Sequence, residues 1–419
     1  MTVDAVIIGL GYVGLPLALE ATRAGKKVLG FDIHPGVVAD LNAGRSHVDD
    51  LSDDDIAEMI AGGFEATTDE SRIAEASAAV ICVPTPLSEE GGPDLRAVES
   101  AVDAVARHLH DGMLVVLEST TYPGTTDEVV RPRLEAGGKV AGTDFHLAFS
   151  PERIDPGNEK FGAKNTPKVV GGQTPACTEA AADFYGAFVD SVVRAKGTRE
   201  AETAKLLENT YRHINIALVN EMARFCHELG IDLWDVIEAA RSKPFGFQAF
   251  YPGPGVGGHC IPIDPNYLSH NVRARLGYPF RFVELAQEIN SSMPGYVVTR
   301  AQDLLNTEGK PLNGSTVLLL GVTYKPNIAD QRESPAVPLA KQLIRKGAVV
   351  QFHDPHVEDW RAVPEATRVQ DADAAVAQAD LTILVQYHRE YDVYALAGTA
   401  QVFFDTRGKA SEAEKVSRL

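Results

Sequence analysis

The first half of the chain alternates short apolar runs with amphipathic stretches of helical period. The apolar runs are rich in Val, Ile, Leu and Ala, as strands buried on both faces usually are. Because a helical pattern separates successive runs, we predict a parallel α/β sheet. The predicted strands are Val3–Ile8, Lys27–Phe31, Ala79–Val83, Met113–Glu118 and His146–Phe149.

The pattern changes at about residue 196. The stretch Glu200–Leu229 contains neither Pro nor Gly, which predicts one long helix within a helical middle section. Its apolar residues recur at helical spacing, and they are numerous enough to indicate a subunit interface as well as an internal core. We therefore expect a homodimer or a higher homo-oligomer. These residues are Leu206, Leu207, Ile214, Leu218, Met222 and Phe225.

From about Ser315 the α/β pattern begins again. A strand at Val317–Leu320, a helix at Pro335–Arg345 and a strand at Val349–His353 repeat the order found at the N-terminus. We predict an α/β fold with two Rossmann-like doubly wound domains joined by a central helical domain that contains the long helix. The predicted boundaries are 1–195, 196–300 and 301–419.

Charge and cysteine content narrow the possible partners. The 58 acidic residues outnumber the 39 basic ones, for a net charge of −19. Such a chain repels polyanions, so nucleic acids and anionic membrane surfaces are not expected partners. No apolar run approaches the roughly 18 residues that a membrane helix needs. The four cysteines follow no disulfide or metal-site spacing, so we expect a cytoplasmic protein without a metal.

A glycine-rich turn follows the first predicted strand. The segment Gly9-Leu10-Gly11-Tyr12-Val13-Gly14 opens a helix, and Asp32 ends the next strand. This order is the dinucleotide-binding fingerprint, in which a helix N-terminus faces the pyrophosphate. A carboxylate at residue 32 accepts hydrogen bonds from ribose hydroxyls and repels a 2′-phosphate. The turn therefore predicts NAD rather than NADP as the cofactor.

Two further loops follow predicted strands at the edge where α/β sheets bind ligands. They are Val83–Pro86, which includes Thr85, and Glu118–Gly124, which includes Thr120. Taken alone, each pattern fits a simple turn as well as a binding loop.

Cys260 lies in an unusual loop that reads Tyr-Pro-Gly-Pro-Gly-Val-Gly-Gly-His-Cys-Ile-Pro-Ile-Asp over residues 251–264. Glycine and proline at this density build a rigid loop whose backbone can approach a ligand closely. A buried structural role suits Cys82, Cys177 and Cys226 better than it suits Cys260. Loops of this kind often carry chemistry, so we expect a chemical role for Cys260, with Asp264 four residues further on.

The order of these motifs resembles the UDP-glucose/GDP-mannose dehydrogenase family over nearly the whole chain. The resemblance rests on the glycine turn, Ser119-Thr120, Ser150-Pro-Glu-Arg153, the Gly-Gly-His-Cys260 loop and Arg332-Glu-Ser334, together with the helix that bears Lys205 and Asn209. Lys243-Pro-Phe-Gly-Phe247 and Asp155-Pro-Gly-Asn158 are most similar to the UDP-N-acetylglucosamine 6-dehydrogenases in this family. The mannosamine enzymes have basic or imidazole side chains where this chain has Pro244 and Gly246.

The resemblance implies a four-electron oxidation of the C6 hydroxyl of a UDP-sugar by two NAD, in polysaccharide biosynthesis. Cys260 would form a thiohemiacetal and then a thioester. Lys205 and Asn209 would stabilise an oxyanion, Asp264 would assist Lys205 as a base, and Thr120 and Glu152 would position water. Thr85, Thr120 and Arg332 would contact NAD. The remaining implied substrate contacts, besides Glu152, Lys205 and Asn209, are Arg153, Arg212, Tyr251, Gly257, Lys325 and Arg407.

Several alternatives stay open at this point. UDP-N-acetylglucosamine is the preferred substrate, with UDP-N-acetylmannosamine and UDP-glucose as rivals. A two-electron dehydrogenase of the 6-phosphogluconate or 3-hydroxyacid type would have a similar architecture but would need no cysteine. A non-catalytic sensor of NAD and nucleotide sugars would need neither a nucleophile nor the cation and carboxylate beside it.

Overall fold

The structure, a computed structural model, describes residues 3–48, 51–86, 92–153, 160–258, 261–411, 413 and 415–419. The chain forms two compact units. The first contains residues 1–208 and 266–276, and the second contains residues 209–265 and 277–419. Among the described residues, no helix combines the length and the apolar character needed to cross a bilayer.

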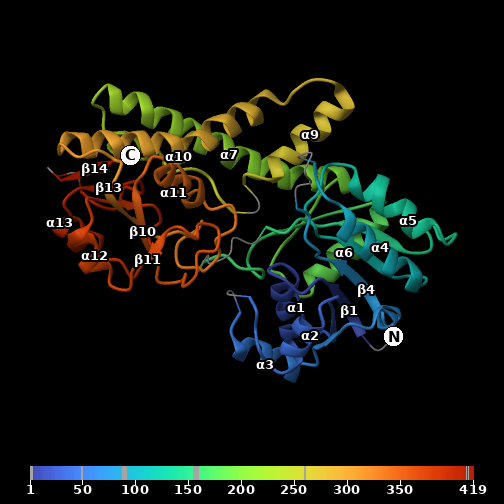
Figure 1. The fold of residues 1–419 in the computed structure, drawn as a ribbon. Helices are drawn as coiled ribbons and strands as arrows, with labels where there is room; N and C mark the ends of the chain where they lie inside the picture. The colour runs from blue at the N-terminus through green and yellow to red at the C-terminus, as the bar shows by residue number, and fades with distance from the viewer. Residues whose placement is uncertain are drawn as a thin grey trace. The chain divides into compact units, whose positions relative to one another are not determined.

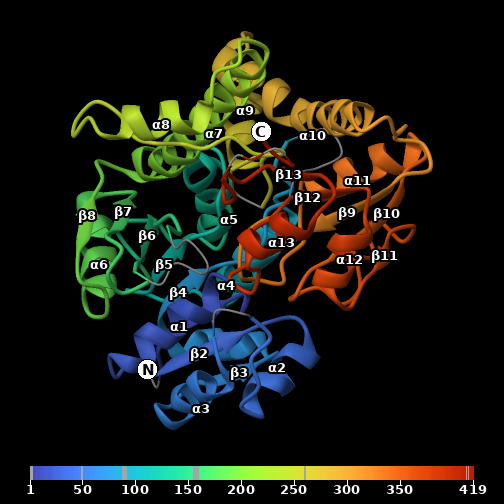
Figure 2. The same cartoon turned by 90° about the vertical axis from the view of Figure 1, so that its left-hand side faces the viewer.

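The first unit is built on an eight-stranded sheet in the order β3-β2-β1-β4-β5-β6-β7-β8, and β4 to β8 follow one another across Figure 2. The order β3-β2-β1-β4-β5-β6 is the doubly wound arrangement, in which ligands bind beside the carboxyl ends of β1 and β4. β7 pairs antiparallel with β6. The strands are β1 (Val3–Ile8), β2 (Val28–Phe31), β3 (Glu65–Thr67), β4 (Ala76–Ile81), β5 (Leu114–Leu117), β6 (His146–Phe149), β7 (Lys168–Gly172) and β8 (Val192–Arg194).

Both faces of this sheet are covered, which explains why its central strands are largely apolar on both faces. Ala5 and Ile7 enter one hydrophobic cluster, while Val6 and Ile8 enter another on the opposite face. The covering helices are α1 (Gly14–Arg23), α2 (Pro35–Asn42), α3 (Asp53–Ala61), α4 (Arg96–His108), α5 (Arg131–Glu135) and α6 (Pro175–Gly186), with short turns η1 (Glu70–Glu75) and η2 (Thr126–Val130).

The helical middle section consists of four helices. α7 (Thr198–Glu228) is the predicted long helix, and α10 (Arg281–Thr307) runs beside its C-terminal part (Figure 1). A buried amide pair joins these two helices, with Asn220 Nδ2 donating to Asn290 Oδ1 at 2.9 Å. The shorter helices are α8 (Leu233–Arg241) and α9 (Asp264–Leu276).

The second unit repeats the doubly wound order in a six-stranded parallel sheet, β11-β10-β9-β12-β13-β14. Val317 and Leu319 of β9 enter one cluster, while Leu318 and Leu320 enter the other. The elements are β9 (Thr316–Leu320), α11 (Ala336–Arg345), β10 (Val349–His353), β11 (Thr367–Arg368), α12 (Ala372–Gln378), β12 (Leu381–Leu384), α13 (Val393–Thr399), β13 (Phe403–Asp405) and β14 (Val416–Arg418).

The predicted α/β fold with two doubly wound sheets and one long helix is confirmed. One strand differs noticeably from its prediction: β4 covers Ala76–Ile81 rather than Ala79–Val83. The chain enters the sheet early because Ala76 pairs with Val3 of β1, and it leaves after Ile81 to form the Val83–Pro86 loop.

Candidate active site

The glycine turn lies at the carboxyl end of β1 and has the shape that a dinucleotide requires. Gly9 has a φ of +91°, and Gly14 packs so tightly that an added Cβ would lie 2.0 Å from Gly9 O. A Cβ on Gly11, by contrast, would meet no heavy atom within 4 Å. No side chain caps the N-terminus of α1. The turn therefore presents an open glycine face and a helix N-terminus, and both fit the pyrophosphate of NAD.

Asp32 is held in place at the end of β2. Its Oδ2 accepts the Leu10 N–H at 3.0 Å, and its Oδ1 accepts the His34 N–H at 2.9 Å. The carboxylate stays partly exposed. Each oxygen has a second lone pair, so an oriented carboxylate can still accept hydrogen bonds from ribose hydroxyls.

The loops that follow β4 and β5 are joined to each other. Thr85 Oγ1 donates to Thr120 O at 2.7 Å, and Ser119 Oγ donates to Val83 O at 2.7 Å. Tyr267 of α9 donates its hydroxyl hydrogen to Thr85 O. Thr85 and Thr120, both implied in cofactor binding, therefore belong to one connected rim at the carboxyl ends of β4 and β5.

Glu202 of α7 fixes the far end of the Thr120 loop. Its carboxylate accepts the Gly124 N–H at 2.5 Å, the Thr126 N–H at 2.9 Å and the Thr126 hydroxyl at 2.7 Å. Burial raises the pKa of this carboxyl to about 7 against the opposing effect of those hydrogen bonds. Glu202 lies three residues before Lys205, so α7 supports both the loop and the implied catalytic cation.

Glu152 follows β6, and two lysines contact it. Lys205 Nζ donates to its main-chain oxygen. Lys168 Nζ lies 3.5 Å from its carboxylate Oε2 and 3.0 Å from Oε2 of Glu118. Lys205 and Lys168 are 7% and 6% exposed. The structure thus brings together Lys205 and Glu152, two of the residues implied in catalysis.

Arg153, next in the chain, points to different partners. Its Nη2 lies 2.8 Å from Glu208 Oε1, and its Nη1 donates to Pro167 O at 2.6 Å. These contacts fasten the loop after β6 to α7. A substrate contact for Arg153 stays a prediction, and residues 155–158 lie outside the described part of the chain.

In the second unit, Asn209 and Asp264 form a buried pair. Asn209 Nδ2 donates to Asp264 Oδ2 at 2.6 Å, and the two residues are 6% and 3% exposed. Asp264 begins α9, where the helix dipole favours a negative charge. Cys260 and His259 lie outside the described residues. Arg212, one turn beyond Asn209 on α7, is exposed.

The glycine-rich loop before Cys260 packs closely against its own unit. Gly253 N–H donates to Asn220 Oδ1 at 2.9 Å, which ties the loop to the amide pair between α7 and α10. A Cβ on Gly257 would lie 2.7 Å from Glu333 O, and one on Gly258 would lie 2.6 Å from the Tyr324 ring. The glycines are required because the segment that follows β9 approaches this backbone directly. Arg332 of that segment pairs with Asp330 at 2.5 Å, and its contact with NAD stays a prediction.

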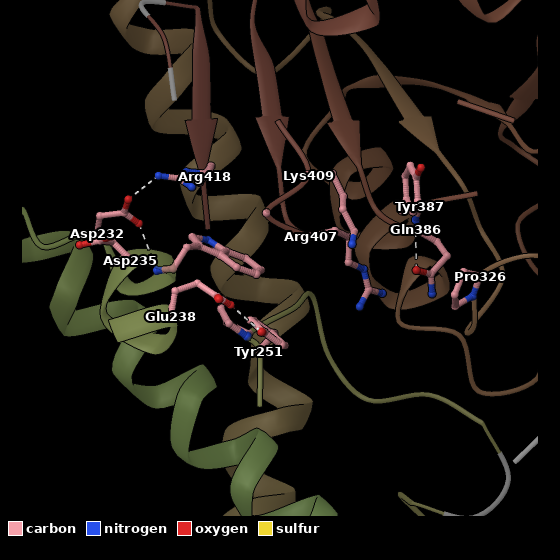
Figure 3. A pocket seen from close by; sticks show the side chains of 13 residues that line it. Asp232, Asp235, Glu238, Tyr251, Pro326, Gln386, Tyr387, Arg407, Lys409 and Arg418 are labelled. Atoms are coloured by element: carbon pink, nitrogen blue, oxygen red, sulfur yellow. Dashed lines mark hydrogen bonds and ion pairs between the residues drawn. The ribbon is translucent and has the colours of Figure 1, made fainter. Parts of the chain in front are cut away.

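A pocket of about 680 Å³ opens in the second unit (Figure 3). One wall comes from α8 and Tyr251, whose hydroxyl donates to Glu238 at 2.7 Å and whose ring stacks on Trp234. Arg407 comes from the other wall, where its Nε donates to Val385 O at 2.7 Å. Burial lowers the pKa of the Arg407 guanidinium to about 10, so it stays cationic at neutral pH. Lys409 and Arg418 also line the pocket, as do the carboxylates of Asp232, Asp235 and Glu238, and Arg418 pairs with Asp232. Lys325, which is partly buried, does not line it.

The second sheet has no equivalent of the cofactor turn. Asp354 matches Asp32, because its Oδ2 accepts the Val322 N–H at 2.7 Å and its Oδ1 accepts the His356 N–H at 2.8 Å. However, His388 Nε2 lies 3.1 Å from Asp354 Oδ2, and both side chains are fully buried. The position that a ribose would take is therefore filled by an imidazole.

His388 also belongs to a group of ligand-type side chains with His356 and Glu390. His388 Nδ1 accepts the Asn327 N–H at 3.0 Å, so the ring proton is on Nε2 and points toward Asp354. In that tautomer, neither ring nitrogen has a lone pair to offer an ion. The absence of a metal from the function stays a prediction.

The sequence did not identify five of the residues described above as site residues: Glu202, Lys168, Glu118, Trp234 and Lys409. Glu202 could have been found, because it lies one helical turn from Lys205. Lys168 begins an apolar strand and has the sequence pattern of an ordinary solvated strand end, and Glu118 was noted only as part of a loop. Trp234 and Lys409 reach their pocket from segments that are far apart in the sequence.

Comparison with known proteins supports the assembled picture. Three models of the UDP-glucose/GDP-mannose dehydrogenase family match the chain: the NAD binding domain over residues 3–189, the central domain over 199–292 and the UDP binding domain over 318–412.

Two curated relatives match almost end to end. UDP-N-acetyl-D-mannosamine dehydrogenase of Salmonella typhi is 34% identical over 96% of this chain and 98% of its own. UDP-N-acetyl-D-glucosamine 6-dehydrogenase of Pseudomonas aeruginosa is 34% identical over 99% and 98%. Among solved structures, UDP-D-ManNAc dehydrogenase of Pyrococcus horikoshii superposes with a TM-score of 0.89, at 30% identity, over 98% of this chain and 96% of its own. The chain belongs to the UDP-glucose/GDP-mannose dehydrogenase family and is an NAD-dependent nucleotide-sugar dehydrogenase.

Proposed function

We propose that this enzyme oxidises the C6 hydroxyl of UDP-N-acetylglucosamine to the carboxylate of the uronic acid. The observation that supports this most directly is the buried Asn209–Asp264 pair, which holds a carboxylate only four residues beyond Cys260. A buried carboxylate and amide beside a cysteine loop suit covalent chemistry on an aldehyde. A two-electron dehydrogenase that releases a ketone or aldehyde would not require them.

The proposed reaction consumes one alcohol, two NAD⁺ and one water, and it yields one carboxylate, two NADH and three protons. Each bound NAD⁺ accepts one hydride. The Cys260 thiolate adds to the intermediate aldehyde to form a thiohemiacetal, and loss of the second hydride converts this to a thioester. Water then breaks the C–S bond and restores the thiol.

The side chains take distinct roles in this proposal. Lys205 and Asn209 stabilise the oxyanion, and Asp264 supports Lys205 when a proton is removed from the alcohol. Thr120 and Glu152 position the hydrolytic water. The hydrogen bond from Lys205 Nζ to Glu152 O supports this division, because it fixes the cation and the water-positioning loop together.

The nucleotide is proposed to bind in the second unit, where Tyr251 and Arg407 line the pocket. Gly257 is a proposed substrate contact outside the pocket lining. Arg407 and Lys409 supply the positive charge that a diphosphate needs in so acidic a chain, while Arg418 is paired with Asp232. Lys325 and Arg212 are proposed to reach the same ligand, and Arg332 to reach NAD.

The choice of sugar rests on Pro244 and Gly246, which lack the basic and imidazole side chains expected of a mannosamine enzyme. The named relatives include enzymes for N-acetylmannosamine and N-acetylglucosamine, so UDP-N-acetylmannosamine is the main rival. NADH formation across a panel of UDP-N-acetylglucosamine, UDP-N-acetylmannosamine, UDP-N-acetylgalactosamine and UDP-glucose decides between them. We expect the highest kcat/KM with the first, and two NADH per sugar. A ratio of one would refute the covalent scheme.

We also propose that the enzyme is a homodimer that uses an exposed apolar face of α7. Tyr211, Leu218 and Phe225 recur every seven residues and are 46%, 53% and 45% exposed. A stripe of this kind on a helix is typical of a subunit interface. Sedimentation should show a dimer, and Leu218→Glu should give a monomer with its helical circular dichroism unchanged. A wild-type monomer would contradict the proposal.

A further inference from the structure

A buried cluster of charges lies behind the loop that bears Glu152. It contains two carboxylates, Glu118 and Glu152, and a single cation, Lys168. Tyr185 of α6 donates its hydroxyl hydrogen to Glu118, and its ring lies 5.1 Å from Lys168 Nζ. Lys168, Glu118 and Tyr185 are 6%, 1% and 0% exposed, so water screens these charges poorly.

The topology of the sheet explains how these groups meet. Parallel strands β5 and β6 both end at the ligand-binding edge, and there Glu118 and Glu152 follow them. β7 pairs antiparallel with β6, so its first residue, Lys168, lies at the same edge. A parallel strand would have placed that lysine at the opposite end of the sheet.

The Lys168 ammonium lies within ion-pair distance of two carboxylates. Lys168 Nζ is 3.0 Å from Glu118 and 3.5 Å from Glu152. Tyr185 stabilises the remaining oxygen of Glu118, while Lys205 binds the main chain of Glu152 rather than its carboxylate. Lys168 therefore provides a cation within ion-pair distance of the Glu152 carboxylate.

We infer that Lys168 is a positioning residue for the hydrolytic step: it orients the Glu152 carboxylate, with Glu118 and Tyr185 fixing the lysine from behind. This inference rests on the proposed role of Glu152 in positioning water. Burial alone would lower the pKa of Lys168, but Glu118 and Glu152 raise it, so the cation persists at working pH. Burial raises the pKa of Glu118, and that of buried Cys82 nearby.

The main test variant must keep the net charge of the cluster unchanged. Lys168→Met removes the cation but leaves two buried carboxylates together, which can unfold the protein. Lys168→Met with Glu118→Gln avoids this problem, because the net charge of the cluster stays at −1, as in the wild type. Lys168→Arg is the conservative control, and Glu152→Gln tests the residue on which the inference depends.

The assay separates hydride transfer from hydrolysis. We expect the double variant to release a rapid burst of NADH close to two per active site, then to turn over at least about tenfold more slowly than wild type with KM little changed. Mass spectrometry should find the acylated Cys260 peptide during that slow phase. Lys168→Arg should largely restore the rate of thioester hydrolysis.

Two outcomes would overturn the inference. If the double variant hydrolyses the thioester at the wild-type rate, Lys168 merely neutralises Glu118 and the inference is overturned. If Glu152→Gln also hydrolyses normally, the proposed role of Glu152 fails, and the inference fails with it. The count of NADH per sugar is unaffected in either case, so failure of the four-electron scheme is recognised separately.

Discussion

The two later glycines of the cofactor turn should respond to the same substitution in opposite ways. Gly14→Ala places a Cβ 2.0 Å from Gly9 O and 3.0 Å from Ile7 Cγ2. Gly11→Ala places its Cβ where no heavy atom lies within 4 Å. The first change should damage the fold, and the second should damage NAD binding alone.

The magnitudes follow from the contacts. At Gly14 an atom must move by more than about 1 Å, in backbone that cannot yield easily, so we expect a loss of about 3 kcal/mol or more in unfolding free energy. Gly11→Ala should change stability by less than about 1 kcal/mol, because the added methyl group also restricts the unfolded chain. If the added methyl group prevents one charge-assisted hydrogen bond to the pyrophosphate, the binding free energy falls by about 1.5–3 kcal/mol. This loss corresponds to at least a tenfold weaker affinity for NAD.

Urea unfolding and calorimetric NAD titration measure the two effects independently. Gly398→Ala is the matched control, since it also adds a Cβ to open space but lies on α13 of the second unit. It should leave the NAD affinity unchanged. If Gly11→Ala binds NAD as tightly as wild type, the pyrophosphate does not approach this turn and our assignment of the cofactor site is wrong.

Three further predictions concern single side chains. Cys260→Ala should abolish uronate formation while NAD and UDP-sugar still bind, and chromatography of the product would contradict the thioester scheme if the rate stayed near wild type. Asp32→Ala should narrow the preference for NAD over NADP in kcat/KM; equal use of both by wild type would exclude our interpretation of Asp32. Glu202 has a folded-state pKa of about 7 against an ordinary 4.5, so the folded protein binds an extra proton between these values. Its contribution to stability is therefore complete below about pH 4.5 and is lost as pH rises through 7, by about 3 kcal/mol. The stability difference between wild type and Glu202→Gln should change accordingly between pH 5 and 8, and a difference independent of pH would show that the carboxyl titrates normally.

Local pattern determined much of this protein. Strands buried on both faces must be largely apolar, so β2, β5 and β9 stand out in the sequence as short apolar runs. The glycine turn was equally plain, because only glycine tolerates the φ of +91° at Gly9 and the packing at Gly14. The helix α7 was predicted as one long element because its 31 residues contain neither Pro nor Gly to interrupt it.

Tertiary structure alone decided which polar side chains meet. Lys168 is adjacent to an apolar strand in sequence, and nothing local distinguishes it from a solvated lysine. It becomes buried between Glu118 and Glu152 because β7 runs antiparallel to β6.

The second sheet shows the same division between local pattern and packing. Its missing glycines indicated that it does not hold a dinucleotide, but they did not reveal that His388 covers Asp354. Long-range pairing of this kind depends on strand order and direction. Strand order and strand direction depend on the packing of the whole domain, so no local sequence pattern predicts them.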